Sequence, residues 1–312
     1  MCKRINRFFP CLLTFYFAAS LAISYFLSVT GYQMDFWLQC IVSQSLLLIL
    51  AFVYIMVNKI NIIKCIPYRK IKPLDALLSI LFGYALVPLV LFINNLSMLF
   101  TTNHVEESAT EFTTYPFLVQ ILLIAVIPPL VEEFVCRGLF YHSYRRNGIL
   151  GAALVSGMVF GILHLNLNQF FYATIMGVAF ALLIEATGSM FSAVLAHFAF
   201  NTYSITMTKL LSLFTSEDVV QESVQAAEEI PMASYVIALF VLAWVAIIFI
   251  IIAYIILQYM AKRNGRQEFL KRNLKKGLRA QNGEHFITVP YAITAGLAII
   301  YMIISEIAMR MY

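Results

Sequence analysis

The sequence is poor in charge. Only 12% of its 312 residues are Asp, Glu, Lys or Arg, whereas 62% are hydrophobic and the mean hydropathy is +0.85. Soluble domains carry about 25% charged residues, so this composition excludes an ordinary soluble domain. It predicts an all-α, polytopic membrane protein.

Motifs for covalent or metal cross-linking are also missing. The five cysteines are scattered and form no CxxC pair, so we predict neither a disulfide framework nor a metal cluster. They are Cys2, Cys11, Cys40, Cys65 and Cys136. The formal charge of +5 does not indicate nucleic-acid binding, because the basic residues lie in the loops between apolar stretches.

Long apolar stretches are what the sequence has in abundance. A helix needs about 20 mainly apolar residues to cross a bilayer, and we predict about eight or nine transmembrane helices on this basis. The candidate stretches are 8–28, 37–57, 76–100, 117–146, 149–166, 168–186, 189–211, 233–259 and 286–308. The fourth is over-long, so we expect only part of it to cross the lipid.

Basic residues are absent from two long loops, 101–116 and 212–232, which are acidic instead. Eighteen of the 21 Lys and Arg lie in segments that would all face the other side, 1–7, 58–75, 145–146 and 261–285. Because cytoplasmic loops carry an excess of Lys and Arg, we expect the N-terminus to be cytoplasmic. The expected location is a bacterial plasma membrane, with the lipid bilayer as surroundings.

Few ionisable residues remain inside the predicted spans. Such residues are costly in lipid and mark functional sites by default. They are Glu132, Glu133, Arg137, His164, His197 and, marginally, Glu185 and Glu306. At about 1.5 Å per residue, Glu132 and His164 lie at equal depth on either side of a turn. His197 and Asn201 approach that depth on a third helix, so we expect one polar pocket that opens toward the inner face.

The spacing within each helix supports this pocket. Glu133 and Arg137 are four residues apart and share a helix face. Pro128 and Pro129, just before them, should free backbone carbonyls and kink the helix. Plainer explanations stay open: a buried structural ion pair, a histidine that only joins helices, or an asparagine that only packs them.

Three short motifs follow one another along the chain: EEFVCR at 132–137, FGILH at 160–164 and HFAFN at 197–201. In order, they resemble the EExxxR, FxxxH and HxxxN/D motifs of the CAAX protease and bacteriocin-processing (CPBP, or Abi) intramembrane proteases. The resemblance covers about residues 117–205. We therefore divide the chain into three parts: N-terminal spans (1–116), a catalytic core (117–211) and C-terminal spans (212–312).

The resemblance implies an intramembrane endopeptidase, acting on a membrane-associated peptide or protein that is CaaX-like or a leader peptide. By the motifs, Glu132 with His164 would activate a water. His197 and Asn201 would bind the oxyanion. The other motif residues would support the helix shape: Glu133, Arg137 and Phe160.

The class of protease is less constrained. No serine lies in a GxSxG-like context, so a serine mechanism fits poorly. Glu132, His164 and His197 would make a possible catalytic zinc set, but no HExxH motif is present. With Glu133 committed to Arg137, we expect neither histidine to have an orienting carboxylate. We therefore expect a metal-free, glutamic-type enzyme without a cofactor, with a zinc metalloprotease as the alternative.

Two functions of another kind remain possible from the same residues. A proton-coupled transporter would use the glutamates and histidines as a relay, although no internal repeat is evident in the sequence. A non-enzymatic bacteriocin-immunity or scaffold protein would tolerate replacement of Glu132.

Overall fold

The computed structural model describes residues 2–62, 66–101, 114–215, 230–278 and 283–311. Within these ranges it is helical and contains no β-strand, as predicted. The acidic residues predicted to face one side from the loops 101–116 and 212–232 lie outside the described residues.

Each predicted span corresponds to a helical segment. In chain order these are α1 (Cys2–Thr30), α2 (Phe36–Val57), α4 (Pro73–Ser97), the composite segment Phe117–Arg145, α9 (Ile149–Leu163), α10 (Leu167–Thr187), α11 (Met190–Phe214), α13 (Met232–Arg263) and α15 (Val289–Met311). A short helix, α14 (Gln267–Lys275), lies between the last two.

Seven of these segments are long and apolar enough to cross a membrane, which confirms a polytopic all-α protein. The two that fall short are α9, which has only 15 residues, and α11. Helix α11 has 25 residues but includes the polar side chains of His197 and Asn201. These two helices carry two of the three sequence motifs. The short helix and the polar helix are thus the ones that contribute to the candidate site.

The composite fourth segment changes its helical type along its length. It runs through α6 (Phe117–Gln120), the π-helix η1 (Ile121–Val126), α7 (Ile127–Glu133), the π-helix η2 (Phe134–Tyr141) and α8 (His142–Arg145). Short π-helical turns inside α-helices are frequent at functional sites. Here one precedes and one follows the turn that carries Glu132 and Glu133.

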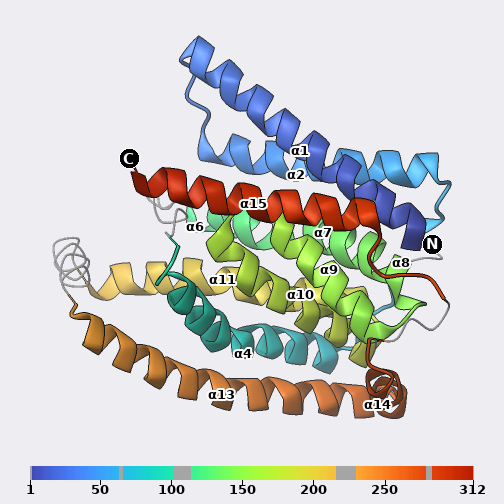
Figure 1. The fold of residues 1–312 in the computed structure, drawn as a ribbon. Helices are drawn as coiled ribbons and strands as arrows, with labels where there is room; N and C mark the ends of the chain where they lie inside the picture. Colours follow the sequence, from blue (N-terminus) through green and yellow to red (C-terminus); the bar gives the residue numbers. More distant parts are fainter. Residues whose placement is uncertain (1, 63–65, 102–113, 216–229, 279–282, 312) are drawn as a thin grey trace.

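The helices surround this composite segment (Figure 1). α1, α2 and α15 lie along one side and α4 and α13 along the other, with α9, α10 and α11 between them. The N-terminus lies at the end of the bundle where α8 and α14 are found, whereas the C-terminus lies at the opposite end. All eight residues of η2 are buried, so this turn is at the centre of the core.

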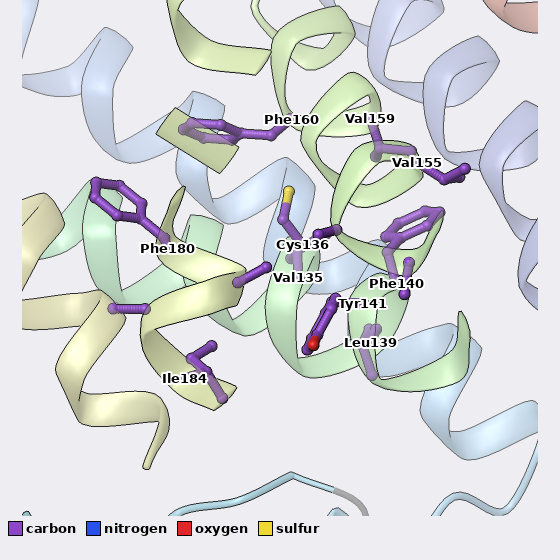
Figure 2. Packing of buried hydrophobic residues seen from close by; sticks show 14 of the residues in the cluster. Val135, Cys136, Leu139, Phe140, Tyr141, Val155, Val159, Phe160, Phe180 and Ile184 are labelled. Carbon is purple, nitrogen blue, oxygen red and sulfur yellow. The ribbon is translucent and has the colours of Figure 1, made fainter. Parts of the chain in front are cut away.

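Side chains of η2 pack against α9 and α10 (Figure 2). Cys136 and Phe140 are fully buried there, as are Val159 of α9 and Phe180 of α10. This packing brings the first sequence motif against the second.

Glycines allow the central helices to approach closely. A Cβ atom on Gly157 would lie 2.7 Å from the Thr174 carbonyl oxygen, and one on Gly161 would lie 2.7 Å from that of Phe170. Such contacts are too short for real Cβ atoms, and small residues are the usual means of close helix packing in membranes. The glycine of FGILH therefore fixes how near α9 comes to α10.

Candidate active site

Asn201 ties α11 to the composite segment through a carbonyl that the prolines leave free. Proline has no N–H, so Pro128 and Pro129 cannot bond to the carbonyl four or five residues earlier. That carbonyl belongs to Ile124, and Asn201 Nδ2 donates to its oxygen at 2.8 Å. The carbonyl that the prolines leave free is thus bound by Asn201. The Asn201 amide keeps a second hydrogen for another acceptor.

The four predicted catalytic side chains line one cavity of about 430 Å³. They are Glu132 of α7, His164 at the end of α9, and His197 and Asn201 of α11. The structure thus brings together residues that lie as much as 69 positions apart in the sequence, from Glu132 to Asn201.

The carboxylate of Glu132 has two polar neighbours. Gln44 Nε2 of α2 donates to Glu132 Oε1 at 3.0 Å, and His197 Nε2 lies 3.8 Å from Glu132 Oε2. In the described part of the chain, no hydrogen bond or ion pair joins Glu132 to His164. Direct polar contacts thus join Glu132 to Gln44 and His197, and the pairing of Glu132 with His164 through a water stays a prediction.

Glu133 is fully buried and binds two partners with one oxygen. Arg137 Nη1 donates to Glu133 Oε1 at 2.8 Å, which is the predicted pair one helical turn apart. His197 Nδ1 lies 2.9 Å from the same oxygen. The expectation that His197 lacks an orienting carboxylate is therefore wrong, because the same Glu133 serves a cation on its own helix and an imidazole on another.

Both histidines have their Nδ1 atoms occupied. His164 Nδ1 lies 2.8 Å from the Phe160 carbonyl oxygen, which can only accept a hydrogen bond. Nδ1 of His164 therefore carries the proton and its Nε2 is left for the cavity. In His197, Nδ1 contacts the carboxylate of Glu133 instead of a backbone carbonyl. Nε2 of His197 faces Glu132.

Phe160 holds these groups in place by aromatic contact. Its ring centroid lies 4.9 Å from that of His164 and 5.6 Å from that of His197, both edge to face. The guanidinium carbon of Arg137 lies 4.4 Å from the centre of the same ring. A cation over a desolvated aromatic face is stabilised by about 2 kcal/mol. Phe160 thus acts as a common support for three motif side chains.

The cavity does not extend in the predicted direction. Its further lining comes from the start of α2, the end of α4 and the start of α10. These belong to the opposite end of the bundle from α8 and α14. The buried side chains of Arg137, Tyr141 and Glu185 lie at the expected inner end and do not line this cavity. With that end taken as the inner one, the cavity lies toward the opposite side from the one expected.

The possible zinc ligands line one cavity but are not placed as a metal-binding group. Across the described ranges, no group of three or more His, Cys, Asp or Glu side chains is placed to hold a metal ion. Glu132 and His197 are close, but His164 is not joined to either by a hydrogen bond or ion pair. The residues present thus do not fit the zinc set of the sequence analysis, and no reaction step is derived through a metal.

Comparison with known proteins agrees with the motifs. Residues 114–203 match the family model described as type II CAAX prenyl endopeptidase Rce1-like. The central segment is similar to this family. The predicted resemblance is thereby confirmed over the part of the chain that holds Glu132, His164, His197 and Asn201.

A curated relative matches the same kind of protein. The chain is 30% identical over 88 residues to "Putative membrane peptidase YdiL" of Bacillus subtilis (strain 168). The match covers 28% of this chain and 36% of that protein, so it spans little more than a third of the relative. No solved structure matches this chain.

The sequence analysis did not identify two residues of the candidate site. Gln44 lies in the apolar run of α2, and an uncharged amide in such a run is itself a signal. Phe180 of α10 lies 5.4 Å from His197 and 5.5 Å from the Arg137 guanidinium, measured from its ring centre. Nothing distinguishes Phe180 from the other apolar residues of its helix until the fold is known.

Proposed function

We propose that this protein is an intramembrane endopeptidase of glutamic type, which hydrolyses a peptide bond in a membrane-associated substrate. The single observation that supports it best is the carboxylate of Glu132 in a cavity, beside the His197 imidazole at 3.8 Å. The Rce1-like family and the relative named as a membrane peptidase support the same class of reaction. A CaaX-like or leader peptide is the proposed substrate class.

Glu132 is the proposed general base. Its side chain is 16% exposed, which allows a water to reach it from the cavity. A positioned base must lie within hydrogen-bond reach of the proton that it removes, and Gln44 fixes the orientation of this carboxylate by its bond to Oε1. We assign Oε2 to the attacking water, and His164 Nε2 on the cavity wall orients the second hydrogen of that water.

His197 and Asn201 are the proposed oxyanion donors. Donors fixed in a site that excludes water stabilise the charge that develops on the carbonyl oxygen. Glu133 holds Nδ1 of His197, which leaves Nε2 directed at the cavity for the oxyanion. Asn201 uses one amide hydrogen for Ile124 and offers the other. Glu133 and Arg137 act through His197 and are positioning residues.

The proton follows a closed path. The water oxygen bonds to the substrate carbonyl carbon while Glu132 takes one water proton. The tetrahedral intermediate then expels the amine as the carbon–nitrogen bond breaks, and Glu132 returns that proton to the leaving nitrogen. The immediate products are a carboxylic acid and an amine, and transfer of the remaining water proton from the acid to the amine gives a carboxylate and an ammonium ion. The enzyme is restored without a metal or other cofactor.

The activity is tested with protein reconstituted in liposomes. We expect cleavage of a prenylated or otherwise lipid-anchored peptide, detected by mass spectrometry of both fragments. Incubation in ¹⁸O-labelled water should place the label in the new carboxylate. A protein that conducts protons across the same liposomes but cleaves no anchored peptide would contradict the proposal and favour the transporter.

Metal dependence is a separate test. We expect activity to survive dialysis against a strong chelator, because Glu132, His164 and His197 do not form a three-ligand group. Elemental analysis of the active protein should show far less than one zinc per chain. Loss of activity on chelation, restored by zinc alone, would make those residues ligands and overturn the metal-free mechanism.

The orientation in the membrane also belongs to the proposal. From the basic segments we propose a cytoplasmic N-terminus in a bacterial plasma membrane, which places the cavity toward the outer aqueous side. Single cysteines in a cysteine-free background should react from inside in 58–75 and 261–285, and from outside in 101–116 and 212–232. If 101–116 and 261–285 react from one side, the predicted topology is wrong.

A further inference from the structure

A second cavity, of about 270 Å³, lies at the end of the bundle where α8 and α14 are found. None of the residues that line it lines the first cavity. Its described wall carries four guanidinium groups, from Arg69, Arg137, Arg145 and Arg266. Apart from Arg137, which positions Glu133, these arginines have no role in the proposed peptide hydrolysis.

One carboxylate in that wall faces these cations. Glu185 is fully buried, and its oxygens accept from Arg145 Nη2 at 2.8 Å and from Arg266 Nη2 at 3.0 Å. Tyr141 donates its hydroxyl to the same carboxylate at 2.8 Å. The sequence analysis placed Glu185 only marginally within a span, yet it joins α8, α10 and the start of α14. Its single charge leaves the cavity strongly positive.

The two remaining arginines have donors to spare. Arg137 has a fully buried side chain whose Nη1 binds Glu133, but its Nε and Nη2 have no hydrogen-bond partner. A buried donor without a partner is costly, and each such group in a native protein calls for an explanation. Arg69 is exposed on the loop before α4, and its side chain forms no ion pair within the part of the chain that the structure describes. The loop is fixed there, because Ser189 donates its hydroxyl to the Arg69 carbonyl at 2.6 Å.

We propose that this second cavity binds a phosphate group, either that of an anionic lipid headgroup or free inorganic phosphate. With the pairs to Glu133 and Glu185 subtracted, four guanidinium charges leave an excess of two. The guanidinium fork matches phosphate oxygens in bidentate geometry, and a tetrahedral phosphate can accept from Arg69, Arg137 and Arg266 at once. A single carboxylate would satisfy fewer of these donors.

The position of the cavity favours the lipid as the source. Residues from the loop before α4, from α8 and from the start of α14 surround it, and these segments lie where most Lys and Arg of the chain are gathered. Basic pockets at the ends of membrane helices are suited to anionic headgroups. The two sites share only Arg137. The test is separate from peptide hydrolysis, because neither Glu132 nor His197 lines this cavity and the variants leave Arg137 unchanged.

The test measures lipid binding to the full chain in detergent micelles by native mass spectrometry. Phosphatidylglycerol is titrated against phosphatidylcholine for the wild type, Arg69→Gln and Arg266→Gln. Arg272→Gln is the matched control, because Arg272 is exposed on α14 outside the cavity and makes the same change of charge. Inorganic phosphate is then added as a competitor.

We expect the wild type to retain phosphatidylglycerol in preference to phosphatidylcholine. Arg69→Gln and Arg266→Gln should each weaken that retention about tenfold, the effect of losing one charge-assisted hydrogen bond, while Arg272→Gln should not. Competition by inorganic phosphate would show that the phosphate alone is sufficient, and its failure would show that the lipid chains contribute. Equal effects of Arg69→Gln and Arg272→Gln would reduce the binding to general surface charge and overturn the proposal.

Discussion

Replacement of Glu132 by Gln is expected to lower the rate of peptide hydrolysis by a factor of about 10²–10⁴, the usual cost of losing a general base. The amide has nearly the same shape and can keep the contact with Gln44, but it cannot accept the water proton. Turnover should fall while substrate affinity changes little. The measurement is kcat and KM for the anchored peptide in liposomes, with fragments counted by mass spectrometry.

Two controls make this result specific. Glu268→Gln removes an exposed carboxylate of α14 that pairs with Lys271, and it should leave turnover unchanged. Gln44→Leu should lower turnover less than Glu132→Gln does, because it removes the group that orients the base and keeps the base itself. Full activity of purified Glu132→Gln protein would exclude the proposed mechanism.

The class of fold and the membership of the site could be predicted from the sequence because both are matters of composition and periodicity. Apolar runs defined the helices, and equal depth along a helical hairpin placed Glu132 near His164 and His197. All four predicted catalytic residues do line one cavity. Helical rise thus gave the level of each group in the membrane.

The pairing of those groups could not be predicted, because it depends on how helices rotate and pack. Spacing along one helix predicted the ion pair between Glu133 and Arg137. It could not predict that His197, from another helix, contacts the same Glu133 oxygen. The hydrogen bond from Asn201 to the Ile124 carbonyl likewise requires α11 to lie against η1. The direction of the cavity likewise depends on which parts of α2, α4 and α10 the fold brings beside Glu132.

The role of Glu185 illustrates the same limit. Counted along its helix, it lies close to the end of a span and near to water. In the fold it is fully buried, because arginines from two other segments and Tyr141 surround it. Ion pairs between distant segments are invisible to a periodicity argument, and the second cavity was therefore not predicted at all.

The largest expected effect on stability comes from Arg137. Replacement by Met removes the cation that neutralises Glu133 in a fully buried pair and leaves the carboxylate with His197 alone. Breaking a buried ion pair by removing one partner costs about 3–5 kcal/mol, because the remaining charge is buried without compensation. We expect Arg137→Met to unfold at markedly lower denaturant, as measured by circular dichroism during titration of micelles with sodium dodecyl sulfate.

A natural control for this prediction exists in the last helix. Arg310 and Glu306 form a pair with the same four-residue spacing, at 3.0 Å, but the Arg310 side chain is 44% exposed. Exposed pairs contribute about 0–1 kcal/mol, so Arg310→Met should change the unfolding free energy little. The double variant Glu133→Gln with Arg137→Met should recover much of the loss, since no uncompensated charge then remains. Equal losses for Arg137→Met and Arg310→Met would show that burial of the first pair carries no special cost, and would remove Arg137 as the group that holds the carboxylate against His197.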